Sequence, residues 1–276
     1  MTRVVARGVG FEVVDRGEGT PVVLVHGMMC NGAFFSRQIE PLARSCRVIV
    51  PDLRGHGASD QPPGGHTVAG YADDLHALLA ELRVSRPVIV GWSMGAMVGY
   101  EYLKRHGADS LAALAIVDQP PSDFVWPGYE HGFFTPEILD ETLEELQTRP
   151  DELTETLAGM MLHEPAPGDV QWMAAELRRV PASIAATILV SQSLKDYRPF
   201  LAQITVPCLV AFGADPKLTS PDAGRYIAQQ IPGARLELFQ HSSHAPFWEE
   251  PERFNAVLEE FVGSVTGGQP SGPARP

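Results

Sequence analysis

The sequence has few lysines, and its acidic residues outnumber its basic ones. Only three of the 276 residues are lysine, and 21 Lys and Arg residues face 34 Asp and Glu residues, which gives a formal charge of −13. A surface of this sign repels phosphate backbones and anionic lipid. We therefore expect neither nucleic acid nor a membrane as a partner.

Cysteines and long apolar runs are also scarce. Cys30, Cys46 and Cys208 are far apart and flanked by apolar residues, which is typical of buried thiols rather than disulfides. No Cys-x-x-Cys pair or histidine cluster offers zinc ligands, so no metal and no cofactor are expected. No run approaches the roughly 18 apolar residues of a membrane span, and the first residues lack a signal-peptide core. A cytoplasmic protein is predicted.

Short β-rich runs alternate with helical periods along most of the chain. Several runs are apolar on both faces, as strands covered by helices on both sides must be. Ser220-Pro221 indicates a helix start. The alternation predicts an α/β fold with a mainly parallel central sheet and helices on both faces. The predicted strands are 11–14, 21–25, 47–50, 87–90, 111–117, 207–212 and 235–239, and the clearest apolar helical stripes are Leu75, Leu78, Leu79, Leu82 and Phe254, Val257, Leu258, Phe261.

The alternation stops over residues 119–203, where four helical stretches follow one another without a strand pattern. Because both ends of this segment rejoin the βα pattern, we expect a helical lid inserted after the sixth strand; the alternative is a separate helical domain. The predicted core is then 1–118 with 204–265. The Gly- and Pro-rich end, 266–276, has little to bury and is predicted to be disordered.

A nucleophile motif follows the predicted strand 87–90. Gly91-Trp92-Ser93-Met94-Gly95 has the form G-x-S-x-G and stands directly before a predicted helix. In that setting the serine sits on a tight strand-to-helix turn that projects its hydroxyl above the sheet. Ser93 is therefore predicted to be a catalytic nucleophile.

Two further stretches, His26-Gly27-Met28 and the loop 51–59 (PDLRGHGAS), occur in the order and spacing of a known family. Together with the serine motif they make residues 3–265 resemble an α/β-hydrolase-fold enzyme. The resemblance implies that the backbone N–H groups of Met28 and Met94 form the oxyanion hole. It also implies a structural, hydrogen-bonding role for His26.

The general base is assigned by the same resemblance to His244, between the last predicted strand and the last helix. The stretch Ser243-His244-Ala245-Pro246 is similar to the family's G-H-x-P form, with serine in place of glycine. His241 is the competing candidate. The remaining histidines are predicted to be solvated: His56, His66, His76, His106, His131 and His163.

Two aspartates compete to be the acid that orients His244. Asp215 lies near the usual family position after strand 207–212, but one residue earlier than the G-x-x-D pattern requires, since Pro216 stands there. Asp118 ends the strand before the insertion, where some family members take their acid. Both remain candidates, with Asp118 preferred.

Aromatic residues are plentiful in the insertion, and some are expected to line an apolar substrate pocket. The alternative is that they only pack the insertion onto the core. Asp123, nearby, is predicted to be an ordinary surface charge. The predicted substrate-binding residues are Trp92 of the serine motif and Phe124, Trp126, Phe133 and Trp172 of the insertion.

The resemblance implies a serine hydrolase that cleaves an ester, lactone or thioester of a small, fairly apolar molecule through an acyl-enzyme. A cofactor-free haloperoxidase or perhydrolase, a C–C bond hydrolase, and an acyl-transferring or cyclising enzyme would use the same triad. A non-catalytic small-molecule receptor on the same fold is an alternative of another class. Its hallmark would be ligand binding without reaction at Ser93.

Overall fold

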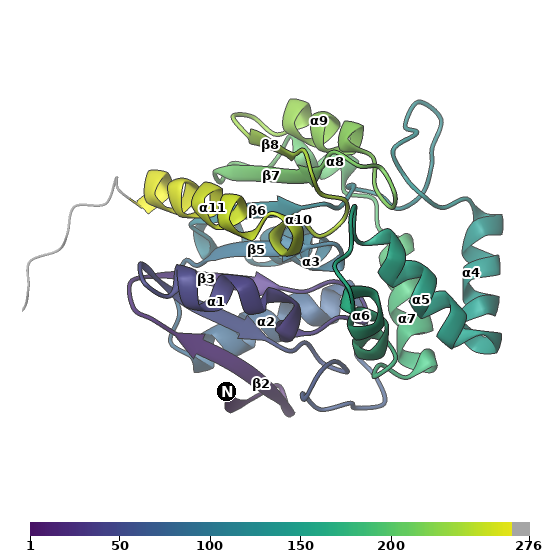
Figure 1. The fold of residues 1–276 in the computed structure, drawn as a ribbon. Coiled ribbons are helices and arrows are strands. Elements are labelled where there is room, and N and C mark those ends of the chain that lie inside the picture. The colour runs from purple at the N-terminus through teal and green to yellow at the C-terminus, as the bar shows by residue number, and fades with distance from the viewer. Residues whose placement is uncertain (267–276) are drawn as a thin grey trace, which may run out of the picture.

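An eight-stranded sheet forms the middle layer of the protein in a computed structural model that describes residues 1–266 (Figure 1). Its order is β1-β2-β4-β3-β5-β6-β7-β8; β1 pairs with β2 and β2 with β4 in antiparallel fashion, and the remaining neighbours are parallel. The predicted, mainly parallel sheet is confirmed. The strands are β1 (Thr2–Ala6), β2 (Val9–Arg16), β3 (Thr20–Val25), β4 (Cys46–Pro51), β5 (Val88–Trp92), β6 (Ala113–Val117), β7 (Cys208–Gly213) and β8 (Arg235–Phe239).

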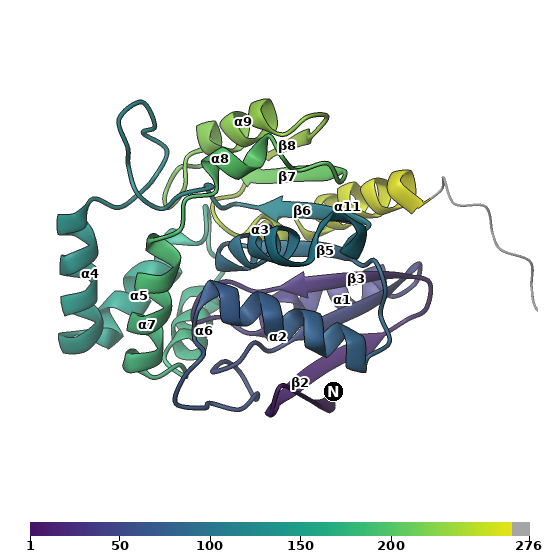
Figure 2. The same ribbon diagram turned by 180° about the vertical axis from the view of Figure 1, so that it is seen from behind.

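Helices cover both faces of this sheet, as the apolar strands require. Helices α1 (Ser36–Leu42) and α11 (Pro251–Thr266) cover the face seen in Figure 1, and α2 (Val68–Glu81) and α3 (Met94–His106) cover the face seen in Figure 2. Alternate residues of one strand serve the two layers: Val22 and Leu24 of β3 pack on the first side, and Val23 and Val25 on the second.

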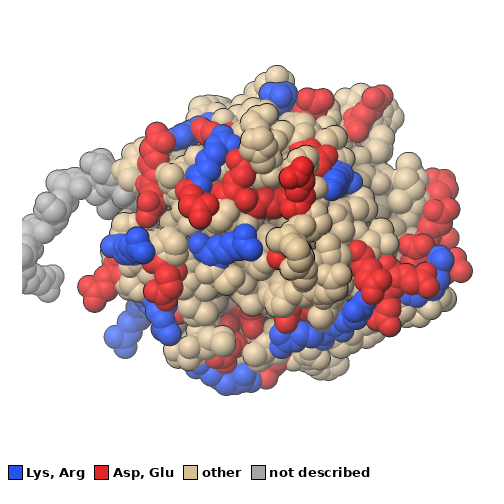
Figure 3. Space-filling view, in the orientation of Figure 1, with Lys and Arg blue, Asp and Glu red and all other residues tan. Residues whose placement is uncertain are grey.

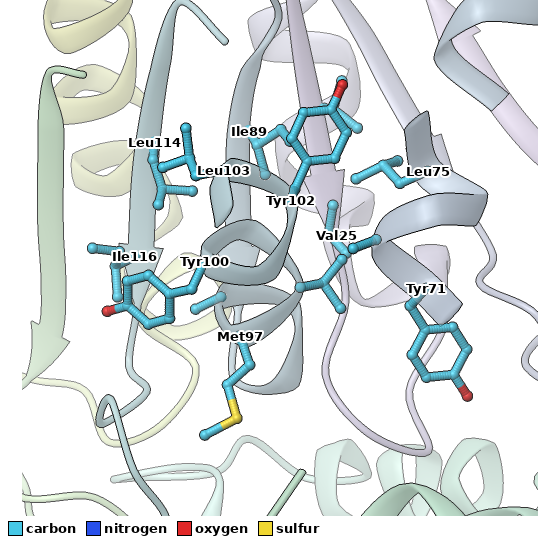
Figure 4. Close-up of a cluster of buried hydrophobic side chains, with 14 of the residues drawn as sticks. Val25, Tyr71, Leu75, Ile89, Met97, Tyr100, Tyr102, Leu103, Leu114 and Ile116 are labelled. Carbon is cyan, nitrogen blue, oxygen red and sulfur yellow. The ribbon is translucent and has the colours of Figure 1, made fainter. Parts of the chain in front are cut away.

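The core beneath α2 and α3 is continuous from strand to helix (Figure 4). Ile89 of β5 and Leu114 and Ile116 of β6 pack against the buried side of α3, and Leu75 of α2 belongs to the same cluster. This packing fixes α3 against β5 and β6. The turn between β5 and α3, which carries Ser93, is therefore held on a rigid support.

The segment between β6 and β7 holds a group of helices at one end of the sheet (Figures 1 and 2). The Thr135 hydroxyl caps the first of them, α4, by accepting the Ile138 N–H. The outer helix α4 carries five acidic residues and no Lys or Arg, which contributes to the acidic surface at this end of the molecule (Figure 3). The helices are α4 (Pro136–Thr148), α5 (Pro150–Met160), α6 (Asp169–Leu177), α7 (Ala182–Ser193) and α8 (Arg198–Leu201).

The first strand, β1, is missing from the sequence prediction. It is an edge strand with mostly exposed side chains, and its short apolar stretch, Val4-Val5-Ala6, stands between Arg3 and Arg7, so it does not have the pattern of a buried strand. The predicted tail lies outside the described residues from 267 onward. Within residues 1–266, none of the helices combines the length and apolar character needed to cross a membrane.

The remaining elements are the short helices η1 (Gly32–Phe35), η2 (Ala108–Ser110) and α10 (Pro246–Glu249), and α9 (Pro221–Gln230), which Ser220 caps as predicted.

Candidate active site

Ser93 occupies a strained turn between β5 and α3. Its φ of 53° lies in the left-handed region that non-glycine residues rarely adopt. The flanking glycines are required by close backbone contacts: a Cβ on Gly91 would lie 2.2 Å from the Gly95 carbonyl oxygen, and one on Gly95 would lie 2.1 Å from the Val25 carbonyl oxygen. The two glycines of the motif are therefore needed to let the chain place Ser93 at the N-terminus of α3.

His244 and Asp118 meet beside this turn. The His244 Nδ1 lies 2.8 Å from Asp118 Oδ1, and both side chains are at most 3% exposed. The Gly213 N–H donates to Asp118 Oδ2 at 2.8 Å, and the Thr219 hydroxyl donates to Oδ1. Both carboxylate oxygens thus accept hydrogen bonds, and Oδ1 faces the imidazole of His244. The other ring nitrogen of His244, Nε2, has no hydrogen-bond partner among residues 1–266.

Asp215 is turned to another histidine. Its Oδ2 lies 2.7 Å from His163 Nδ1 on the exposed surface, and this hydrogen bond raises the pKa of His163. Of the two competing aspartates, the structure brings only Asp118 to His244. His241 is exposed and meets Glu250 through its backbone N–H, so it takes no part in the cluster.

The segment after β3 lies against Ser93. A Cβ on Gly27 would lie 3.1 Å from the Ser93 Cβ, so the backbone leading to Met28 runs beside the serine. Buried His26 supports this segment: its Nδ1 bonds the Gly27 carbonyl at 2.8 Å, and its Nε2 accepts the Leu53 N–H at 3.0 Å. Burial lowers the pKa of His26 to about 4, so the ring is neutral and its two nitrogens suit this donor and acceptor pair.

His56 joins the same support. Its predicted solvation is wrong, as is that of His66, which is also buried and whose Nε2 lies 2.7 Å from the Pro62 carbonyl oxygen. The His56 ring is fully buried, its Nε2 accepts the Met29 N–H at 3.2 Å, and its Nδ1 bonds the Arg54 carbonyl at 2.9 Å. Burial lowers its pKa to about 3. The sequence motif 51–59 contains this histidine, but nothing in its spacing shows that it faces inward.

Ser93 and His244 open onto one apolar cavity of about 330 Å³. The core contributes Met28, Met29 and Leu218, and the helices between β6 and β7 supply most of the remaining wall. Buried polar side chains are few in this lining. The contributors from those helices and the loop before them are Phe133, Phe134, Ile138, Thr142, Leu146, Leu153, Thr156, Leu157, Met160, Met161, Leu177, Leu189 and Gln192.

Comparison with known proteins places this architecture in a family. Residues 20–251 match the model described as alpha/beta hydrolase fold. The chain belongs to the α/β-hydrolase fold family. It is 31% identical to the pimeloyl-[acyl-carrier protein] methyl ester esterase of Chromobacterium violaceum, over 89% of this chain and 95% of that protein. It is 28% identical to the non-heme chloroperoxidase CPO-A1 of Kitasatospora aureofaciens, over 92% and 96%.

A solved esterase has the same fold as this α/β-hydrolase. The esterase from Exiguobacterium antarcticum superposes with a TM-score of 0.90 at 26% identity, covering 95% of this chain and 98% of that one. The predicted fold and enzyme class are confirmed by these matches.

The aromatic lining of this hydrolase differs from the prediction. Phe133 lines the cavity, whereas Trp92 is fully buried behind His244 and donates its indole N–H to the His244 carbonyl at 2.8 Å. Trp172 is outside the cavity lining and stacks on Trp248. Phe124 and Trp126 also lie outside the lining. Trp92 and Trp172 pack against phenylalanine rings instead, whereas Trp126 is 39% exposed and donates its indole N–H to the Ser122 hydroxyl at 2.8 Å.

Asp123, predicted as surface charge, is fully buried within the segment between β6 and β7. Its two carboxylate oxygens accept N–H groups from Gln119 and Gln192, each at 2.7 Å. Burial raises the pKa of Asp123 to about 7. Because Gln192 lies 69 residues away in sequence, no local pattern could reveal this pairing.

The connection between α5 and α6 is fastened to the loop that carries His244. The Met160 carbonyl accepts from the Ser243 hydroxyl, and the Met161 carbonyl accepts from the Ala245 N–H, both at 3.1 Å. Glu249 receives N–H groups from His163 and Ser243 at 2.6 and 2.9 Å. The helical insertion and the histidine loop therefore share one hydrogen-bonded support.

Proposed function

We propose that this α/β-hydrolase cleaves a carboxylic ester, lactone or thioester of a small, apolar molecule through an acyl-enzyme on Ser93. The observation that carries the proposal is the buried His244–Asp118 pair at the same apolar cavity as Ser93. Two compared proteins are named esterases, which supports the same bond type.

In the proposed first step, Ser93 Oγ attacks the carbonyl carbon while His244 Nε2 takes the hydroxyl proton. Asp118 holds Nδ1 protonated and stabilises the imidazolium that forms. The backbone N–H groups of Met28 and Met94 are proposed to bind the oxyanion; removing one such donor costs about 3 kcal/mol in other enzymes. His244 then returns the proton to the leaving alcohol.

Water completes the reaction in the second step. His244 takes a proton from the water, the hydroxide attacks the acyl carbon, and the bond to Ser93 Oγ breaks to release the acid. These steps need no cofactor. The apolar lining favours an aliphatic or aromatic acyl group, because each buried CH₂ contributes about 0.8 kcal/mol. We also propose that 119–203 acts as a lid over a core formed by 1–118 and 204–265.

A fluorophosphonate probe tests the proposal directly, since it reacts only with an activated serine. We expect covalent labelling at Ser93, with no labelling in Ser93→Ala and full labelling in Ser264→Ala, a surface control on α11. Rates of hydrolysis of p-nitrophenyl esters from acetate to decanoate then show which acyl chain length the enzyme prefers. Ligand binding without labelling would contradict the proposal and favour a receptor.

A further inference from the structure

Half of the methionines in the chain line the candidate active site. Met28, Met29, Met160 and Met161 border the cavity, and the chain has eight methionines in total. Leucine would supply a similar apolar volume, but a thioether differs from it chemically. Its sulfur accepts an oxygen atom from peroxides and becomes a polar sulfoxide.

These methionines flank both proposed catalytic residues. Met28 and Met29 directly follow Gly27, whose backbone packs on Ser93. Met160 and Met161 hold the two residues on either side of His244 through their carbonyl groups. An oxidant formed at the acyl carbon on Ser93 would therefore arise in the cavity that these four methionines line.

We propose that hydrogen peroxide makes this enzyme oxidise its own cavity: a peracid forms on Ser93 and transfers oxygen to the surrounding methionines. The inference rests on the proposed acyl-enzyme. Peroxide attacks the acyl carbon in place of water, the bond to Ser93 Oγ breaks, and the serine regains its proton. The peracid O–O bond then breaks as its outer oxygen bonds to a methionine sulfur, which supplies two electrons, and the carboxylic acid is left.

Oxidation of this kind would switch the cavity from apolar to polar. Sulfoxides in the wall oppose burial of an aliphatic chain, so long acyl esters lose more turnover than acetate. Internal consumption of the peracid would also make the chain a poor peroxide-dependent halogenating enzyme, in contrast to the compared chloroperoxidase. We therefore infer that peroxide inhibits ester hydrolysis by this enzyme.

The test is peptide mass spectrometry of the full-length protein during turnover of p-nitrophenyl hexanoate with hydrogen peroxide. We expect the cavity methionines to gain one oxygen at least about tenfold faster than Met1, because the oxidant is generated beside them. Met1 is 79% exposed and reports free oxidant in solution, and Met173 is fully buried outside the cavity lining. Peroxide without ester should oxidise Met1 first.

Two variants make the result decisive. Ser93→Ala should reduce cavity oxidation to the level seen with peroxide alone. In Met160→Leu/Met161→Leu, the rate of peroxide inactivation, normalised to its own starting activity, should fall below that of the wild type, while Met173→Leu should match the wild type. Should the double variant fail to fold, the Ser93 comparison still decides.

Failure of the inference is separable from failure of the proposed function. Absence of fluorophosphonate labelling and of ester hydrolysis without peroxide would contradict the serine mechanism. Normal labelling and hydrolysis with cavity methionines oxidised no faster than Met1, or equally fast in Ser93→Ala, would overturn the inference alone.

Discussion

Replacing Asp118 by asparagine tests the candidate active site most sharply. Asp118 accepts three hydrogen bonds, from His244, Gly213 and Thr219, and an amide of the same shape must give up one acceptor. If the amide oxygen stays on the Gly213 N–H, the new NH₂ group points at His244 Nδ1. That nitrogen must then accept, so the proton moves to Nε2, which could no longer take the Ser93 proton.

The expected loss follows from this tautomer change. Removing the orienting charge while keeping the geometry costs about 10⁴-fold in kcat in other serine triads, or about 5 kcal/mol of transition-state stabilisation. The assay is kcat for a p-nitrophenyl ester in the wild type and in Asp118→Asn, with circular dichroism to show that the variant is folded.

Asp215→Asn is the matched control. Asp215 is a partly exposed carboxylate paired with His163 and Lys217 at the surface, and exposed ion pairs contribute about 1 kcal/mol or less. We therefore expect kcat within a few-fold of the wild type. The reverse order of the two variants, with Asp215→Asn inactive and Asp118→Asn active, would refute the reasoning.

Three further predictions follow from the described contacts. Between pH 6.5 and about 4, His26 and His56 bind protons in the unfolded chain but not in the folded protein, so they lower the free energy of unfolding as the pH is lowered. Asp123, whose folded pKa is about 7, binds a proton in the folded protein over this range and offsets about half of that effect, so a net fall of a few kcal/mol is expected; urea midpoints at several pH values measure it. Gly95→Ala places a methyl group against the Val25 carbonyl and should lower stability by about 1–3 kcal/mol, and an unchanged Tm would contradict the close contact. Leu177→Ala should raise kcat/KM for decanoate relative to acetate esters and cost about 2–5 kcal/mol of stability; an unchanged ratio would show that Leu177 does not limit chain length.

The sheet and most helices are predictable because their signals are local. Buried parallel strands are apolar on both faces, and the helix start at Ser220 is capped by the residue that the sequence indicates. Ser93 is predictable for the same reason, since its glycine neighbours meet steric demands of the turn itself. By contrast, β1 has only a short apolar stretch between two arginines, and its place in the sheet is set by its pairing with β2.

Burial of single polar residues escaped prediction because it depends on partners distant in sequence. Asp123 can be buried because its carboxylate accepts a hydrogen bond from the Gln192 side chain. His56 can be buried because its ring accepts one from the Met29 backbone N–H. The sequence does not decide between Asp118 and Asp215 for a related reason. Which of the two meets His244 depends on the direction of each side chain, and the order of residues does not show that direction. The aromatic residues of the insertion show the same limit, since composition predicts an apolar wall but not which rings form it.

The shared hydrogen bonds between the α5–α6 connection and the His244 loop have a consequence for engineering. A chimera that takes 119–203 from another enzyme must place its own backbone carbonyl groups where those of Met160 and Met161 lie, or Ser243 and Ala245 lose their hydrogen-bond acceptors, and it must present a backbone N–H to Glu249 as His163 does. A graft that shifts this connection would also displace His244, the proposed base. Grafts confined to α4, which contributes Ile138, Thr142 and Leu146 to the cavity wall, leave those bonds intact and make this outermost helix the safer place to reshape the entrance.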